Sequence, residues 1–292
     1  MPSTRPTIAD KRRIFQQLHQ SGCFVIPNPW DAGSARFLQT LGFKALASTS
    51  AGFAWSQGRR DGAVSCERVL EHLAELVAAT DVPVNADFEN GFAHEPAALA
   101  EHVRAAVASG VAGLSIEDSS AHGGPLYEVD AAVARIRAAR RAIDAAGGDT
   151  VLVGRAECFL VGRPDLDETI ARLKAYAGAG ADCLYAPGLR TREQIGAVVQ
   201  ALAPRPVNVM TGFPGRLNVS ELSALGVRRI SVGGALARAA WSGFMSAARQ
   251  IAMHGRFDEI AAGASHMEIN ALFGPSSDGS GGGSDVGGSG QP

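Results

Sequence analysis

Residues 110–117, with the sequence GVAGLSIE, decide the fold, because they join a helix end, a buried strand and a carboxylate within eight residues. Glycine just past a helix end supplies the left-handed turn that returns the chain to a sheet. A short apolar run that ends in a polar residue is typical of a parallel strand buried on both faces. An apolar strand residue four positions after a glycine recurs at Gly42, Gly180 and Gly226. The repeated spacing predicts a chain of strand–helix units.

Eight such apolar runs alternate with amphipathic segments along the chain, and each is short enough for a buried parallel strand. Helix starts carry capping side chains at Asp165, Thr191 and Asn218, each three residues before Glu or Gln. Eight units without a break in composition favour an α/β fold of the closed (β/α)8 TIM type over an open doubly wound sheet. The expected strands cover residues 24–28, 45–48, 83–87, 113–117, 151–155, 183–186, 207–210 and 229–233.

The barrel is expected to occupy residues 1–273 as a single domain with extra helices at both ends. Residues 7–20 have the spacing of an entry helix, and a helix over residues 234–253 closes the last unit. Residues 258–273 are predicted to form one further helix. Residues 274–292 are almost entirely Gly, Ser, Asp and Pro, so they cannot bury enough apolar surface to become ordered. We therefore predict a disordered tail there.

Composition and charge exclude several classes of function. The chain has 292 residues, of which 46% are hydrophobic, and a formal net charge of −2. No global field therefore attracts it to nucleic acid or to an anionic membrane. Its apolar runs are too short to cross a bilayer, and its first residues have no apolar core typical of a signal peptide. The four cysteines form no C-x-x-C pair, which favours a reduced, cytoplasmic protein without a zinc or redox site.

Carboxylates follow several predicted strands, at the end of the barrel where active sites lie. Asp87 and Glu89 end the third strand, and alternation places both side chains on the same side. Glu117 ends the fourth strand, and Asp61 lies in the loop after the second. Anions this close repel one another. The structural alternative is that these acids cap helices or pair with arginine. A hard divalent cation with oxygen ligands relieves that repulsion, so we predict a site for Mg²⁺, with Mn²⁺ as the alternative.

Side chains near these acids could contact an anionic substrate. Arg155 ends the fifth strand, where it could bind a carboxylate and stabilise a developing oxyanion. A salt bridge to one of the neighbouring glutamates is its structural alternative. Ser48, Thr49 and Ser50 end the second strand and leave backbone N–H groups and hydroxyls open to an anion. Asn208 on the seventh strand is a further candidate for substrate binding.

Five stretches together resemble the isocitrate lyase/phosphoenolpyruvate mutase superfamily. The likeness spans roughly residues 10–255, in the order expected for that superfamily, and its specific part is the pair of segments around Asp87 and Glu117. The five stretches are residues 28–35 (NPWDAGSA), 48–52 (STSAG), 84–91 (VNADFENG), 114–118 (LSIED) and 153–156 (VGRA).

The resemblance implies that the protein binds Mg²⁺ and a small 2-oxo acid or its enolate. Asp87 would bind the metal directly, whereas Asp61, Glu89 and Glu117 would hold its water molecules. The superfamily fold is a barrel whose eighth helix is exchanged between subunits, so the resemblance also implies a homodimer or a homotetramer.

The same resemblance assigns substrate contacts. Ser48 and the turn after it would face the pyruvyl carboxylate and oxygen, and Arg155 would contact the substrate. We therefore predict Ser48, Glu117 and Arg155 as the catalytic residues.

The loop after the fourth strand departs from the superfamily pattern. Lyases of the superfamily carry a Lys-Lys/Arg-Cys-Gly-His loop with a catalytic cysteine, whereas residues 118–127 read DSSAHGGPLY. This argues against isocitrate or methylisocitrate cleavage. We therefore predict an Mg-dependent C–C lyase or decarboxylase that acts on a small 2-oxo acid through a pyruvate enolate. The alternatives are a C–P bond mutase or hydrolase of the phosphonopyruvate type, and a barrel that binds a metabolite without turnover.

Overall fold

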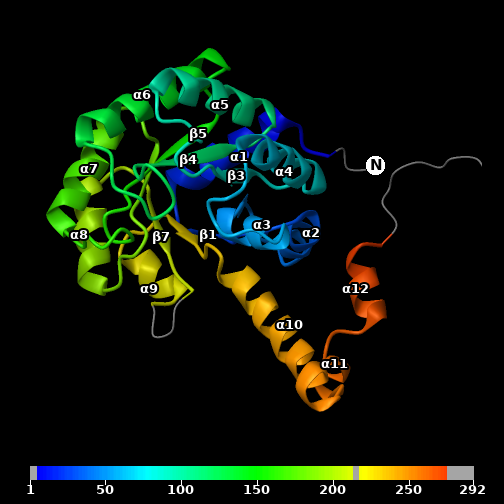
Figure 1. The fold of residues 1–292 in the computed structure, drawn as a ribbon. Helices are drawn as coiled ribbons and strands as arrows, with labels where there is room; N and C mark the ends of the chain where they lie inside the picture. The colour runs from blue at the N-terminus through cyan, green and yellow to red at the C-terminus, as the bar shows by residue number, and fades with distance from the viewer. Residues whose placement is uncertain (1–4, 213–216, 275–292) are drawn as a thin grey trace, which may run out of the picture.

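The structure is a computed structural model that describes residues 5–212 and 217–274. Eight parallel strands form one sheet that closes into a TIM-type barrel (Figure 1), as predicted. The closure between the first two strands includes a 3.0 Å hydrogen bond from the Ala47 amide to the Pro27 carbonyl. The strands are β1 (Phe24–Ile26), β2 (Leu46–Ala47), β3 (Val84–Asp87), β4 (Gly113–Glu117), β5 (Val151–Arg155), β6 (Cys183–Tyr185), β7 (Val207–Met210) and β8 (Arg229–Ser231).

Helices surround the barrel in sequence order, and the last three extend away from it (Figure 1). They are α1 (Ile8–Gln20), α2 (Ala32–Thr40), α3 (Ser50–Ser56), α4 (Cys66–Ala79), α5 (Pro96–Ala108), α6 (Val129–Ala145), α7 (Leu166–Gly178), α8 (Arg192–Leu202), α9 (Val219–Ala224), α10 (Ala235–His254), α11 (Asp258–Ala261) and α12 (His266–Leu272).

The local signals in the sequence act as predicted. Side chains of Asp165, Thr191 and Asn218 accept hydrogen bonds from the backbone of the third helical residue. The four glycines at helix ends have positive φ angles between 83° and 106°: Gly42, Gly110, Gly180 and Gly226. Strands β4, β5 and β7 have the predicted bounds, and the other five are one or two residues shorter. Strand β8 ends early because the amides of Val232 and Gly233 donate to the Asn28 side chain.

An apolar plug closes the N-terminal end of the barrel. Phe15 of α1 is completely buried, and its ring makes edge-to-face contacts with His19 and Phe24, at centroid distances of 4.6 Å and 6.4 Å. A Cβ atom on Gly113 would lie 2.6 Å from Cε1 of Phe15, so this close approach requires glycine. Burying a phenylalanine side chain contributes about 1.5–3 kcal/mol, which places this end among the stabilising parts of the fold.

Helix α10 projects away from the barrel (Figure 1), and Ala237 is its only buried residue. The predicted single helix over residues 258–273 is wrong, because the structure forms the two short helices α11 and α12 there. The side chain of Ser265 forms a capping box with Glu268, which starts a new helix instead of continuing the first. Of the predicted tail at residues 274–292, all but Gly274 lies outside the described residues.

Within residues 5–212 and 217–274, none of the helices has the length and apolar character needed to cross a bilayer. All four cysteines are free thiols. A cytoplasmic location stays a prediction.

Candidate active site

A cavity of about 170 Å³, lined mostly by polar and charged residues, opens where the barrel strands end, at the edge opposite the apolar plug. Strand β3 carries Asp87 to this edge, strand β5 carries Arg155, and the turn after β2 lies in the wall next to β3, on the side away from β5. The barrel therefore brings together seven residues that the sequence predicted for metal or substrate binding: Ser48, Thr49, Ser50, Asp61, Asp87, Arg155 and Asn208.

Arg155 is the central cation of the site. Its Nη1 atom lies 3.1 Å from Oδ1 of Asp87 and 3.2 Å from Oε2 of Glu117, and its Nε atom lies 2.6 Å from Oε1 of Glu157. Its guanidinium also lies over the Tyr185 ring, 5.2 Å from the centroid. Burial opposes ionisation of the guanidinium, but the neighbouring acids raise the pKa of Arg155 well above its usual value. The expected salt bridge to a glutamate is present, and one fixed cation holds three carboxylates in place.

The turn after β2 holds Asp87 from the other side. The Asp87 amide donates to Oγ of Ser48 at 2.8 Å, and the Ser50 amide donates to Oδ2 of Asp87 at 3.0 Å. Thr49 is the N-cap of α3, and its hydroxyl accepts from the Gly52 amide. Both oxygens of Asp87 therefore have partners, and the carboxylate has one orientation.

The prediction that Asp87 and Glu89 point the same way is wrong. Strand β3 ends at Asp87, and Glu89 has a φ of 47°, in the left-handed region, so the strand alternation does not continue to it. Glu89 and Glu117 instead line a neighbouring cavity of about 420 Å³. Glu89 still interacts electrostatically with Asp87, which lines the first cavity. Burial raises the pKa of Glu89 to about 8, with Asp87 and Glu117 adding to the effect.

Asp61 has the feature that points most directly to a cation. Its Oδ1 atom is buried and has no hydrogen-bond partner in the described residues, while Oδ2 lies 3.6 Å from Nδ1 of His122. Burial, followed by the charge of Asp87, raises the pKa of Asp61. A buried carboxylate oxygen without a partner is costly, and a cation would remove that cost.

The donor set fits Mg²⁺. The candidate donors are all carboxylate oxygens, which a hard cation prefers. Within the described parts of the chain, no three His, Cys, Asp or Glu side chains are arranged to ligate one ion directly. This agrees with Mg²⁺ chemistry, since Mg²⁺ usually takes one or two carboxylates and keeps several waters.

Asp118 has a structural role. It is buried, Nη1 of Arg172 lies 3.2 Å from its Oδ2 atom, and the Tyr176 hydroxyl donates to the same oxygen. The Glu157 amide donates to its other oxygen at 2.8 Å. Asp118 thus ties the end of β4 to the end of β5 and to α7.

Four residues of the site were not found from the sequence, although the alternation of strand side chains could have found them. Asn85 lies two positions before Asp87 on β3, and Glu157 two positions after Arg155, so each shares a face with a predicted residue. Tyr185 on β6 and Arg229 on β8 also face the cavity. Their strands carry no acid, so a pattern of carboxylates at strand ends does not indicate them.

These residues define an acid-rich barrel mouth around one arginine, built at the strand ends of a TIM-type barrel. The chain belongs to the phosphoenolpyruvate mutase/isocitrate lyase superfamily, since the family model described as phosphoenolpyruvate phosphomutase matches residues 15–252. Enzymes of this superfamily include oxaloacetate decarboxylase, 2-methylisocitrate lyase and phosphoenolpyruvate mutase, and its members use Mg²⁺.

Individual relatives cover most of the chain. An uncharacterized Mycobacterium tuberculosis protein is 33% identical over 221 residues, which are 75% of this chain and 81% of the relative. An oxaloacetate decarboxylase of Bradyrhizobium is 32% identical over 216 residues, 70% of each chain. The crystal structure of a candidate lyase/mutase from Burkholderia cenocepacia is 48% identical, covers 91% of this chain and 97% of its own, and superposes with a TM-score of 0.88.

Proposed function

We propose that this protein is an Mg-dependent carbon–carbon lyase that cleaves a small 2-oxo acid through a pyruvate enolate, with oxaloacetate decarboxylation as the leading reaction. The observation that carries the proposal is that two features line the same small cavity. Arg155 contacts three acids, and Asp61 has a buried carboxylate oxygen without a hydrogen-bond partner. The oxaloacetate decarboxylase among the relatives supports the same reaction class.

The side chains divide the work as follows. Asp87 would hold Mg²⁺ directly, and Asp61, Glu89 and Glu117 would hold its waters. When bound, Mg²⁺ stabilises the negative charge that develops on an enolate oxygen. Arg155 donates hydrogen bonds to the same developing charge, in a site whose acids already fix its orientation. The turn from Ser48 to Ser50 orients the substrate carboxylate.

The reaction breaks the bond between C3 and C4 of oxaloacetate. Carbon dioxide departs, and the electron pair of the broken bond forms the C2–C3 double bond of the enolate. A proton taken up at C3 then gives pyruvate. The departing group needs no proton, so the absence of cysteine from residues 118–127 is no obstacle to this reaction.

The test is an assay of oxaloacetate and related 2-oxo acids with Mg²⁺, repeated after chelation and with Asp87→Ala. We expect chelation and the substitution each to abolish turnover, whereas Glu75→Ala, which changes an exposed acid on α4, leaves it intact. Turnover that survives both treatments would contradict the proposal. Phosphorus NMR of a phosphonopyruvate reaction detects the C–P alternative, and tight oxalate binding without turnover of any acid identifies the non-catalytic alternative.

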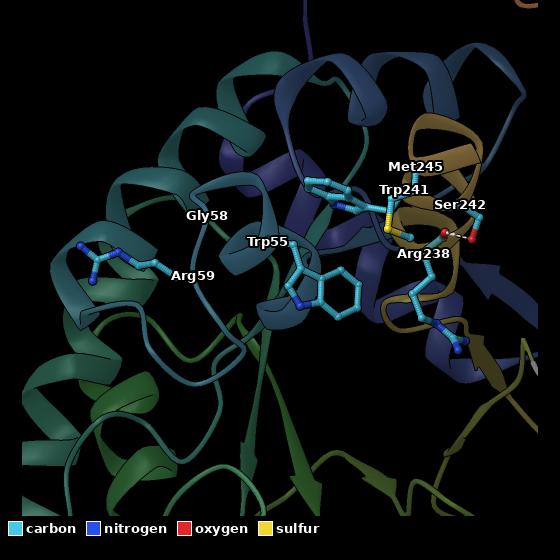
Figure 2. A pocket seen from close by; sticks show the side chains of 7 residues that line it. All are labelled: Trp55, Gly58, Arg59, Arg238, Trp241, Ser242 and Met245. Carbon is cyan, nitrogen blue, oxygen red and sulfur yellow. Dashed lines mark hydrogen bonds between the residues drawn. The ribbon is translucent and has the colours of Figure 1, made fainter. Parts of the chain in front are cut away.

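We also propose that α10 packs against a second copy of the chain, in a homodimer or a homotetramer of helix-exchanged pairs. Its apolar side chains are exposed, with Trp241 at 38% and Phe244 at 63%. Figure 2 shows Trp241 and Met245 of α10 beside Trp55, around a cavity of about 560 Å³ that offers room for apolar side chains of a partner. Large exposed apolar patches mark protein interfaces. Light scattering should show an oligomer that Phe244→Glu dissociates, and a monomeric wild type would contradict this.

A further inference from the structure

A second cation lies at the floor of the active cavity. Arg229 begins β8 and is only 3% exposed, and it points into the barrel interior among the residues that line the cavity. Its Nε atom donates to Oδ1 of Asn208 at 2.9 Å, and its Nη1 atom donates to Oδ1 of Asn85 at 3.3 Å. Both partners are buried neutral amides, so they satisfy donors of the guanidinium without balancing its charge.

Three other arginines have anionic partners, and the buried Arg135, which does not line the cavity, donates to the backbone carbonyls of Asn90, Ala93 and His94. Arg155 contacts three acids, Arg172 lies 3.2 Å from Asp118 and 2.9 Å from Glu168, and Arg12 lies 2.9 Å from Asp149. Among the described residues, Arg229 forms no such ion pair. A buried charge without a counter-ion is costly, so an anion that enters the cavity gains more from Arg229 than from a solvated cation.

The charge of Arg229 extends through the barrel interior. Burial lowers the pKa of His19 to about 3, and the charge of Arg229 is the second cause of this shift. The third guanidinium nitrogen, Nη2, makes no hydrogen bond to any residue within 5–212 or 217–274. The guanidinium of this cavity-lining residue therefore keeps a donor that neither asparagine uses.

The two cations of the cavity differ in their capacity to bind a new anion. Arg155 is already held by Asp87, Glu117 and Glu157, and together these four groups carry excess negative charge. An incoming carboxylate meets repulsion there, unless a metal ion is bound. Arg229 meets the same carboxylate with a positive charge that no acid balances and with the N–H groups of Nη2 as hydrogen-bond donors.

We propose that Arg229, held by Asn85 and Asn208, is a specificity-determining residue that binds the carboxylate of a small organic acid at the floor of the cavity. The identity of that acid as a 2-oxo acid rests on the proposed function. Arg229 selects for an anionic end group, so an ester or amide of the same acid would bind poorly.

The sharpest test changes the charge next to Arg229 while keeping the shape. Asn208→Asp places a carboxylate at the position that already accepts from Nε of Arg229, so the guanidinium gains an internal counter-ion. Arg229→Met removes the cation, and Arg229→Lys retains it. Arg12→Met is the matched control, because it removes a buried arginine at the other end of the barrel. The probe is oxalate, titrated by calorimetry with Mg²⁺ present, and the folded state is checked by circular dichroism.

We expect Asn208→Asp and Arg229→Met to weaken oxalate binding about tenfold or more, a loss of one counter-charge, with Arg229→Lys in between and Arg12→Met unchanged. If Arg229→Met does not fold, Asn208→Asp decides the outcome. Wild-type affinity in the folded variants, or a wild type that binds neither oxalate nor pyruvate, would overturn the inference. Oxalate binding that depends on Arg229, in a protein that turns over no 2-oxo acid, would refute only the proposed function.

Discussion

The two ends of the same eight strands have opposite chemistry. At the N-terminal end, Phe15 and Phe24 close the barrel with apolar surface and belong to one buried hydrophobic cluster. At the C-terminal end, Asp61 has an unpartnered oxygen, and Glu89 has a pKa raised to about 8 by burial and by its acidic neighbours. One end therefore stabilises the fold, and the other concentrates charge at a cost in stability. In TIM barrels generally, catalytic groups lie at the C-terminal ends of the strands.

The protein itself offsets part of the charge repulsion at the C-terminal end of the barrel. Arg155 offsets the charge of three acids, and the Ser50 amide fixes one oxygen of Asp87. The remaining excess of negative charge is what a divalent cation would offset. The comparison therefore predicts that substitutions at the closed end change stability alone, whereas those at the mouth change ligand binding and activity, with effects on stability of either sign.

The largest effect is expected for Arg155→Met. Removing one partner of a buried ion pair costs about 3–5 kcal/mol, and here three acids lose the same cation. Turnover should fall by about a thousandfold or more, because the hydrogen bonds to the developing oxyanion are lost. Urea denaturation and steady-state kinetics measure the two effects. A stable, active variant would show that Arg155 contributes neither to the fold nor to the chemistry.

Phe15→Ala should change only stability. Phenylalanine-to-alanine substitutions in a core cost about 3–5 kcal/mol, and Phe15 is fully buried at the closed end. The kcat of the protein that remains folded should equal that of the wild type. If kcat falls at a temperature where circular dichroism shows a folded protein, the two ends of the barrel are coupled and the comparison fails.

Glu89→Gln should stabilise the metal-free protein at alkaline pH. The folded-state pKa of Glu89, about 8, lies above its usual value, so wild-type stability is lost as the pH rises from about 4.5 to about 8. After allowance for solvent screening of a partly exposed side chain, the free energy of unfolding of the variant should exceed that of the wild type by about 1–2 kcal/mol near pH 8 with a chelator present.

Adding Mg²⁺ should reverse the ranking of these two proteins, because bound metal stabilises the wild type more than the variant. Thermal unfolding midpoints of the wild type and of Glu89→Gln, measured with and without Mg²⁺, test both predicted differences. Equal unfolding midpoints for the two proteins at pH 8 under chelation would show that Glu89 is not repelled by its neighbours.

His19 provides the smallest predicted effect. Its folded-state pKa is lowered to about 3 by burial and then by Arg229, so the unfolded chain takes up a proton that the folded protein cannot. Stability is therefore full above about pH 6.5 and is lost as the pH falls toward 3. Between about pH 7 and 5.5 the wild type should lose roughly 1 kcal/mol more than His19→Phe, measured by urea denaturation. Parallel stability profiles for the two proteins would contradict this.

Sequence patterns anticipated the barrel well because each signal is local. Gly110 and Gly180 mark helix ends through their backbone conformation alone, and Thr191 caps a helix within four residues of itself. Strand ends were less certain, since the end of β8 depends on Asn28, which lies about two hundred positions earlier. The single helix expected over residues 258–273 does not form, because the capping box at Ser265 starts a separate helix.

The site was anticipated only in part. The residues Asp61, Asp87 and Arg155 were identified as strand-end or loop groups, and the barrel does bring them to one cavity. Glu89 was assigned to the same face by alternation, which its left-handed backbone breaks. Arg229 could not be predicted from strand-end carboxylates, because its strand carries no acid.

The sequence by itself determined that this chain forms a barrel of eight strand–helix units with acids at the strand ends, because apolar periodicity, caps and helix-end glycines act over a few residues. Only the tertiary structure decided which charges balance one another. Arg155 contacts three acids, whereas Arg229 contacts two amides, and both facts depend on strands that lie far apart in the sequence. Electrostatic interactions depend on distance and burial, which residue spacing does not encode across a closed sheet.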